Sequence, residues 1–213
     1  NSNIKSAIIL AIGNLWLKNY NINQISERVD IKRKSVSEIL KKVHVRLKDL
    51  CYDKTEQICG PGIVVEVDES KFGKRKYHRR HRVEGVWVLD VVERSPFRRV
   101  IFVPIEKRNS VNLILLLRKY IHPQSIIYSD CWKGYYNLKS YFSDHLTVNH
   151  SVSFVNPHTG THTNTIEGTW NGLKQTIPPR YRTKELILPY LIRFMFNRNE
   201  KNDLFSKLIK YFF

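Results

Sequence analysis

Asp68 and Asp130 are the acidic residues whose positions best suit metal chemistry. Each follows an apolar, β-branched run, IVVEVD in the first case and SIIYSD in the second. The carboxyl ends of two neighbouring strands meet at one edge of a sheet, so two such carboxylates can lie side by side. A hard divalent cation such as Mg²⁺ takes oxygen ligands and uses few protein carboxylates. The pattern therefore indicates a divalent-cation site.

Glu167 is the candidate for the third acid, which a site for two metal ions needs. It lies in HTNTIEGTWNGLK, early in a predicted helix, with Trp170 and Lys174 on the same face. Trp170 packed on the sheet would direct Glu167 toward the two aspartates. Simpler interpretations stay open, because a strand-end Asp is often a turn residue or helix N-cap and a helical Glu is usually solvated. Glu69 is an alternative to Asp68, since neighbours in a strand point to opposite faces.

A basic segment follows these acids directly. Residues 71–82 contain seven Lys or Arg, two His and no acid, and the chain has a formal net charge of +17. Cations this dense repel one another unless a polyanion binds them, so we expect contacts with DNA phosphates; a solvated charged hairpin is the alternative. The cations expected to contact DNA are Lys71, Lys74, Arg75, Lys76, Arg79, Arg80 and Arg82.

The elements before Gly60 have helical periodicity. Helices are predicted over 3–19, 22–29 and 33–49, with a turn at Asp30-Ile31. Ser35 and Glu38 have the spacing of a capping box; a position one residue inside the helix is the alternative. Three short helices with a tight turn resemble a helix-turn-helix domain over 1–50, whose recognition helix would begin with the DNA-contacting residues Arg33, Lys34 and Ser35. A small helical bundle with a basic edge is the alternative. A linker is predicted over 51–62, where Gly60-Pro61-Gly62 breaks regular structure.

The remainder, 63–213, has the pattern of a mixed α/β domain. We predict strands over 63–68, 86–93, 98–104, 125–129 and 146–149, and helices over 109–121, 131–141, 164–176 and 184–200.

The composition of the 213-residue chain suits one large domain, or a small and a medium one. No apolar run approaches the roughly 20 residues that cross a bilayer, and no signal-peptide pattern is present, so we expect no membrane partner. The three cysteines lack metal-binding spacing, which favours free thiols in a reducing compartment.

Several stretches resemble the Merlin superfamily of DDE transposases and its bacterial insertion-sequence relatives with an ISXO-like DDE domain. They occur in the family's order over about 63–199. The longest, LTVNHSVSFVNPHTGTHTNTIEGTWNGLK, is also the most specific. The others are VDESKFGKRKYHR, VEGVWV, VVER, SDCWKGY and RFMFNR.

The resemblance implies an RNase H-like, retroviral-integrase-like catalytic domain with a mixed five-stranded sheet. It implies catalysis by Asp68, Asp130 and Glu167, with 61 and 36 intervening residues, and two bound Mg²⁺ or Mn²⁺ ions. Lys174 matches a basic position that is typical of such helices, and we expect it to contact DNA. The loop residues His150, His162 and Asn164 are possible accessory residues. The implied partners are the terminal inverted repeats of a transposon, target DNA and at least a second copy of the chain, in the nucleus of a eukaryote or the cytoplasm and nucleoid of a bacterium.

Two departures from the family pattern favour an alternative function. Arg79-Arg80-His81 replaces an Arg-Gly-Arg sequence, and Asp90-Val91 replaces a Gly-Gly pair. Because Gly serves where the backbone bends or approaches a ligand, these changes could alter a hairpin or a DNA contact. The alternative is a domesticated or inactive transposase-derived protein that still binds DNA.

Overall fold

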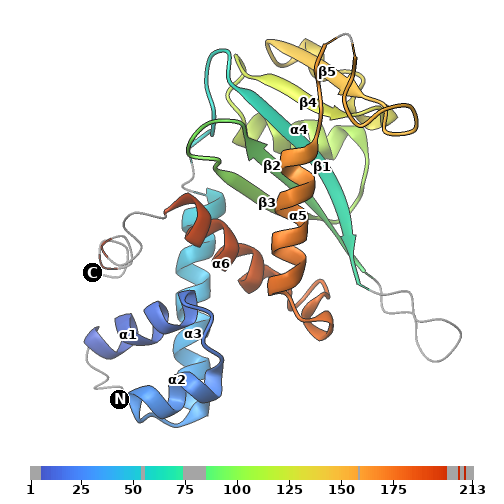
Figure 1. Cartoon of the computed structure of the whole chain (residues 1–213). Helices are drawn as coiled ribbons and strands as arrows, with labels where there is room; N and C mark the ends of the chain where they lie inside the picture. The colour runs from blue at the N-terminus through green and yellow to red at the C-terminus, as the bar shows by residue number, and fades with distance from the viewer. Residues whose placement is uncertain are drawn as a thin grey trace, which may run out of the picture. The chain divides into compact units, whose positions relative to one another are not determined.

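The computed structural model describes residues 6–53, 56–73, 85–157, 159–200, 206 and 209 (Figure 1). Contacts between residues group the chain into two compact units. The first contains Asn1–Thr55 and Phe196–Phe213, and the second contains Glu56–Met195.

The first unit is helical where the structure describes it. Its elements are α1 Ser6–Leu17, α2 Ile22–Val29, α3 Arg33–Lys48 and a π-helical turn, Asp49–Asp53. The predicted helices 22–29 and 33–49 agree with α2 and α3 to within one residue, and the one predicted over 3–19 contains α1. Apolar residues at helical spacing form the core, which contains Ile12, Leu17, Ile25, Val36, Leu40, Val43 and Leu47.

The capping of these helices differs from the prediction. Ser35 is the third residue of α3 and so lies inside the helix, and the N-cap residue Lys32 forms no side-chain cap, so Ser35 and Glu38 form no capping box. A Ser caps a helix only from the position before its first turn. The capping box lies at α2 instead, where Asn21 Oδ1 accepts from the Gln24 N–H at 3.1 Å and Gln24 Oε1 accepts from the Asn21 N–H at 3.0 Å.

The second unit is built on a five-stranded mixed sheet. Its strands are β1 Val64–Phe72, β2 Val86–Glu93, β3 Val100–Ile105, β4 Ile126–Asp130 and β5 Asp144–Val148. The strand order is β3-β2-β1-β4-β5. Pairing is antiparallel between β1, β2 and β3 and parallel from β1 through β4 to β5. The predicted mixed sheet is therefore confirmed, and it is compatible with an RNase H-like domain.

Strand β1 is four residues longer than predicted, so Asp68 is not its last residue. The stretch from Glu69 to Phe72 pairs with β2, whose residues there are Leu89 to Val86. Its sequence, ESKF, has one apolar residue and no alternation of polar and apolar residues, so the pattern did not predict a strand there. Pairing with an apolar neighbouring strand overrides this weak local preference.

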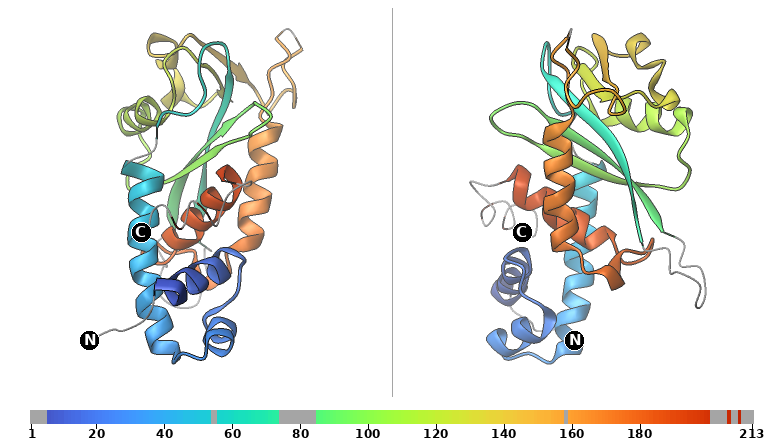
Figure 2. Two further views of the ribbon diagram at one scale, coloured as in Figure 1. Left: turned by 90° about the vertical axis from the view of Figure 1, so that its left-hand side faces the viewer. Right: turned by 45° about the vertical axis from the view of Figure 1, so that its right-hand side comes forward.

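Helices α4 Ser110–Tyr120 and α5 Asn164–Thr176 lie on opposite faces of the sheet (Figures 1 and 2). The face under α5 carries Glu66 and Asp68 of β1, which both bond to α5. On the same face Phe194, from α6 Leu188–Asn199, lies 5.6 Å from Phe102 between ring centroids. The predicted bounds of α5, 164–176, agree with the structure.

Two other predicted helices are wrong in part. The segment predicted as helix 131–141 forms two 3₁₀ turns, Lys133–Tyr135 and Leu138–Ser140. A Cβ at Gly134 would lie 1.8 Å from the Trp132 ring, so this segment is folded closely around that ring. The last predicted helix, 184–200, begins at Leu188 instead, because Pro189 fits only the first turn of a helix; a 3₁₀ turn, Pro179–Tyr181, precedes it.

Part of the predicted linker 51–62 pairs with the sheet unit. Ile58 forms a β-bridge with Ile121, and its N–H donates to the Tyr120 carbonyl at 2.8 Å. Further along, the Gly62 N–H donates to the Gln124 carbonyl at 3.1 Å. These bonds hold the segment that precedes β1 beside the segment that precedes β4, and so align the two strands that carry Asp68 and Asp130.

No helix in the described part of the chain is both long and apolar enough to span a bilayer. The cysteines Cys51, Cys59 and Cys131 are free thiols. Burial raises the pKa of Cys51 and of Cys59 to about 12, so neither thiol is reactive near neutral pH.

Candidate active site

Asp68 and Asp130 lie on one face of adjacent parallel strands. The last residue pair of β1 with β4 joins Glu66 and Tyr128. Continuing this register by two residues sets Asp68 opposite Asp130, just beyond the paired part. From here β1 leads to β2 on one side, and β4 leads to β5 on the other. The crevice where chain connections diverge in this way is a common ligand position in open α/β sheets.

The electrostatics of this pair favour a cation. The pKa of Asp68 is raised, mainly because its carboxyl group is buried; the hydrogen bond from Trp170 lowers it, and the negative charge of Asp130 raises it. The charge of Arg108 also lowers this pKa but does not cancel the effect of burial, so a divalent cation would stabilise the pair of acids further.

Replacing Asp68 with Asn is expected to stabilise the fold at neutral pH without metal. Because the pKa of Asp68 is higher in the folded chain than in the unfolded one, the folded chain holds this proton more tightly. The free energy of unfolding therefore falls as pH rises from the ordinary Asp pKa through the raised one. Thermal unfolding at a series of pH values should give a higher Tm for Asp68→Asn at pH 7, with the difference shrinking toward pH 4. A difference that does not change with pH would contradict this cause.

Hydrogen bonds orient both aspartates. Trp170 Nε1 donates to Asp68 Oδ2 at 2.9 Å, and the Trp132 backbone N–H donates to Asp130 Oδ1 at 3.0 Å. The Trp170 ring is buried, with centroid distances of 5.8 Å to Phe72 and 5.4 Å to Phe102. Packing of Trp170 on the sheet, which the sequence predicted, is confirmed. The same side chain attaches α5 to the sheet and orients Asp68.

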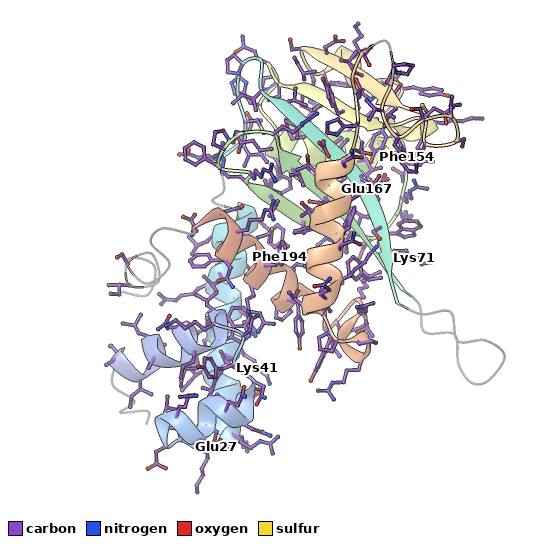
Figure 3. All side chains as sticks on the ribbon, in the orientation of Figure 1. Glu27, Lys41, Lys71, Phe154, Glu167 and Phe194 are labelled. Carbon is purple, nitrogen blue, oxygen red and sulfur yellow. The ribbon has the colours of Figure 1, made fainter. Side chains whose placement is uncertain are left out.

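Glu167 lies in the first turn of α5, near the sheet (Figure 3). Its side chain is half exposed. His150 Nε2 lies 3.8 Å from Glu167 Oε1 and 2.8 Å from Thr163 Oγ1. The structure thus brings the predicted accessory residue His150 to Glu167, while Trp170 holds the next turn of α5 on Asp68.

The donor chemistry of these acids fits a hard divalent cation, because carboxylate oxygens are the ligands that Mg²⁺ and Mn²⁺ prefer. Asp68 and Asp130 meet this requirement side by side. Within the described residues, however, no group of three or more His, Cys, Asp or Glu side chains is arranged to hold a metal ion. Asp68 and Asp130 on the sheet and Glu167 on α5 thus lie on one side of the unit, but their carboxylates are not close enough together to form a three-ligand metal site.

Glu69, the alternative to Asp68, points to the opposite face of the sheet. Its carboxylate is buried, and Arg108 Nη2 donates to Glu69 Oε2 at 3.3 Å. Burial raises the pKa of Glu69, and the Arg108 charge opposes the rise. The Arg108 guanidinium lies 4.0 Å from the Trp132 ring centroid and 4.9 Å from that of Trp87. Glu69 thus has its own cation on its own face, which leaves Asp68 as the acid that shares a face with Asp130.

The predicted DNA-contacting cations are only partly within the described residues. Lys71 lies on β1 and is exposed, with its Nζ 5.7 Å from the Trp87 ring centroid (Figure 3). Lys174 lies on α5 with its Nζ 5.8 Å from the Trp170 ring centroid. Arg33 and Lys34 are exposed at the start of α3, and Ser35 follows them. The others lie outside the described residues: Lys74, Arg75, Lys76, Arg79, Arg80 and Arg82.

The other two predicted accessory residues flank the start of α5. His162 Nε2 accepts a hydrogen bond from Arg94 Nη2 at 2.7 Å, and its Nδ1 lies 3.4 Å from the Asn164 backbone nitrogen. Asn164 is the exposed first residue of α5. These contacts place His162 in the support of the helix, on the side of Arg94 and Glu66.

Sequence reasoning missed Glu66, which bonds to the first turn of α5, and Arg94, which contacts Glu66 and His162. Alternation along β1 puts Glu66 on the same face as Asp68, and this signal could have identified it. Glu66 is fully buried and lies 3.4 Å from Arg94 Nε. No sequence pattern connects Arg94 to Glu66, because their pairing depends on the sheet register.

The ISXO2-like transposase domain is the family whose sequence model matches this chain, over residues 61–199. The match covers more than half of the 213 residues and includes every strand of the sheet and helix α5 of the candidate site. No curated protein matches the chain.

Proposed function

This chain belongs to the family of ISXO2-like transposase domains, and on that premise we propose that it cleaves DNA at transposon ends and joins those ends to target DNA. The observation that carries the proposal is the placement of Asp68 and Asp130 on one face of adjacent parallel strands, under the helix of Glu167. The family implies binding to DNA, and a net charge of +17 suits a polyanionic partner.

Asp68, Asp130 and Glu167 would hold two Mg²⁺ or Mn²⁺ ions. Bound metal ions lower the pKa of an attacking water or hydroxyl and stabilise the leaving oxygen of an in-line displacement at phosphorus. The chain itself orients the acids, through the Trp170 side chain for Asp68 and the Trp132 N–H for Asp130. His150, whose Nε2 lies 3.8 Å from Glu167 Oε1, would donate a hydrogen bond to a phosphate oxygen.

The substrate would pass along the basic surface next to these acids. Lys174 lies two helical turns after Glu167 on the same side of α5, whereas Lys71 of β1 points, by strand alternation, to the face of the sheet that carries Glu69. Bound metal ions would neutralise the carboxylates, while Lys174 would attract phosphates next to the scissile one and Lys71 would contact the DNA backbone farther along.

Neutralising Lys74, Arg75 and Lys76 together is expected to weaken binding to any DNA and to flatten its salt dependence. Log K falls linearly with log salt concentration, and each lost phosphate contact reduces the magnitude of this negative slope by roughly 0.9. Titrations at several salt concentrations measure the slope. Lys139→Gln is the control, because Lys139 is already paired with Asp144 at 3.0 Å. An unchanged slope in the triple variant would count against DNA contact by this segment.

Recognition of the transposon ends and catalysis are proposed to reside in different parts of the chain. A catalytic site that accepts varied target DNA cannot itself recognise the transposon ends. We therefore assign that recognition to residues 1–50 as a helix-turn-helix domain, with 51–62 as linker and 63–213 as an RNase H-like catalytic domain. Pairing of two ends requires at least a homodimer. Within transposases, the motifs quoted above support kinship with the Merlin superfamily.

The test is a cleavage assay on DNA that carries the element's own ends, with Mg²⁺ or Mn²⁺. Cleavage at the ends followed by strand transfer supports the proposal. Specific binding without cleavage under either metal would favour the domesticated DNA-binding protein, for which the substitution of Asp90-Val91 for a Gly pair is the supporting observation. Asp90 is buried directly opposite Asp68 in the sheet register, so this substitution lies next to the candidate site.

A further inference from the structure

The first turn of α5 is not capped by its own N-cap side chain. The first four N–H groups of a helix have no partner within it, and a side chain at the N-cap commonly accepts from one of them. At α5 the N-cap residue Thr163 forms no such bond, and its hydroxyl bonds to His150 instead. The acceptor comes from the sheet: the Ile166 N–H donates to Glu66 Oε2 at 2.8 Å, across 100 residues of sequence.

The carboxylate of Glu66 is completely buried, yet it has two sources of positive charge. One is the N-terminal end of α5, whose dipole attracts an anion. The other is Arg94, whose Nε lies 3.4 Å from Glu66 Oε1. Arg94 is held in turn by His162, at 2.7 Å, and by the Tyr128 ring, 5.4 Å from the guanidinium. Glu66 therefore links the sheet, the helix and the loop that precedes the helix.

Glu66 and Asp68 attach α5 to β1 at two points with matching spacing. Residues two apart in a strand are separated by about 6.6 Å. Their partners, Ile166 and Trp170, are four apart in the helix, which corresponds to about 6.0 Å. Because the two spacings agree, both bonds form together and hold the helix in one register against the strand. Glu167 lies between the two attachment points.

We propose that Glu66 is a positioning residue of this site. It fixes the first turn of α5 on β1 and thereby fixes Glu167 relative to Asp68, with Arg94 and His162 as its support. This role rests on the proposed function of Asp68 and Glu167 as metal ligands. Glu66 itself faces the backbone of α5 and the guanidinium of Arg94, and contacts neither substrate nor metal.

The experiment compares Glu66→Ala and Glu66→Gln in the full chain with Glu93→Gln as a control. Glu93 is also a buried acid of the sheet that is paired with an arginine, since its Oε2 lies 2.7 Å from Arg99 Nε. Arg99, however, directly precedes β3 and does not contact the residues that hold α5. One measurement is amide hydrogen exchange over residues 164–170. The other is the Mg²⁺ concentration that gives half-maximal DNA cleavage. Glu66→Gln keeps an oxygen that can accept from the Ile166 N–H, so it tests the role even if Glu66→Ala fails to fold.

We expect Glu66→Ala to speed exchange in the first turn of α5 by at least about tenfold, the equivalent of losing one hydrogen bond. We expect it to raise the half-maximal Mg²⁺ concentration by a similar factor. Glu66→Gln should recover most of the protection and part of the Mg²⁺ response, and Glu93→Gln should alter neither. Faster exchange with an unchanged Mg²⁺ requirement would overturn the positioning role, and so would wild-type exchange in Glu66→Ala. If the wild-type chain cleaves no DNA, the proposed function fails, and exchange still decides whether Glu66 holds α5.

Discussion

Replacing Asp68 with Asn, or Glu167 with Gln, is expected to reduce DNA strand cleavage at least about 1,000-fold while DNA affinity stays within a few fold. Metal ions stabilise the charge that develops at the attacking and leaving oxygens by several kcal/mol, and each 1.36 kcal/mol is a factor of ten in rate. Affinity for DNA comes mainly from phosphate contacts with cations, which these substitutions leave in place. Both replacements keep the shape of the side chain, and in Asp68→Asn the amide oxygen could still accept the bond from Trp170 Nε1.

The matched control for these variants is Asp144→Asn. Asp144 is a β5 acid at the far end of its strand from the residue that pairs with Asp130, and it is joined to Lys139. Cleavage of end-labelled DNA and binding by titration are measured on all three variants and on the wild type. A variant of Asp68 or Glu167 that cleaves at the wild-type rate would remove that residue from the catalytic set. Equal loss in the Asp144 variant would instead indicate a general effect of charge.

The strands and helices of the sheet unit were largely predictable because their residues obey the periodicity of the elements they form. The run VWVLDVVE is apolar throughout most of its length and lies inside the sheet as β2. The segment NTIEGTWNGLKQT alternates polar and apolar residues with the period of a helix, and it forms α5. Both Asp68 and Asp130 could be identified for the same reason, since each follows a run of regular pattern.

The contacts that define the site were not predictable, because they depend on register and not on local pattern. The pairing of β1 with β4 decides that Asp68 lies opposite Asp130, and the crossing of α5 decides that Glu66 bonds to Ile166. The extension of β1 through ESKF depends on its neighbour β2 in the same way. In the stretch after Asp130, close folding around Trp132 replaced a predicted helix by 3₁₀ turns.

Replacing Trp170 with Ala is expected to destabilise the sheet unit by about 3–5 kcal/mol, the usual cost of removing a large buried aromatic ring. The ring fills the space between Phe72 and Phe102, at 5.8 and 5.4 Å, and its N–H also satisfies Asp68. Trp170→Phe keeps most of the packing and removes only the donor, so about 1.5–3 kcal/mol should be lost, as for a hydrogen bond to a charged group. Urea unfolding followed by circular dichroism measures both losses.

The two Trp170 variants separate packing from orientation of the acid. If the indole N–H holds Asp68 in place for metal binding, Trp170→Phe should lose cleavage activity well beyond its loss of stability. Phe194→Leu is the control, because the partly buried Phe194 also packs against Phe102 but has no hydrogen-bonding group. It should be destabilised to a similar degree and keep its activity at a temperature where all the variants are folded. Equal activity in Trp170→Phe and Phe194→Leu would mean that Trp170 contributes only packing, because Asp68 would then reach its catalytic position without the indole donor.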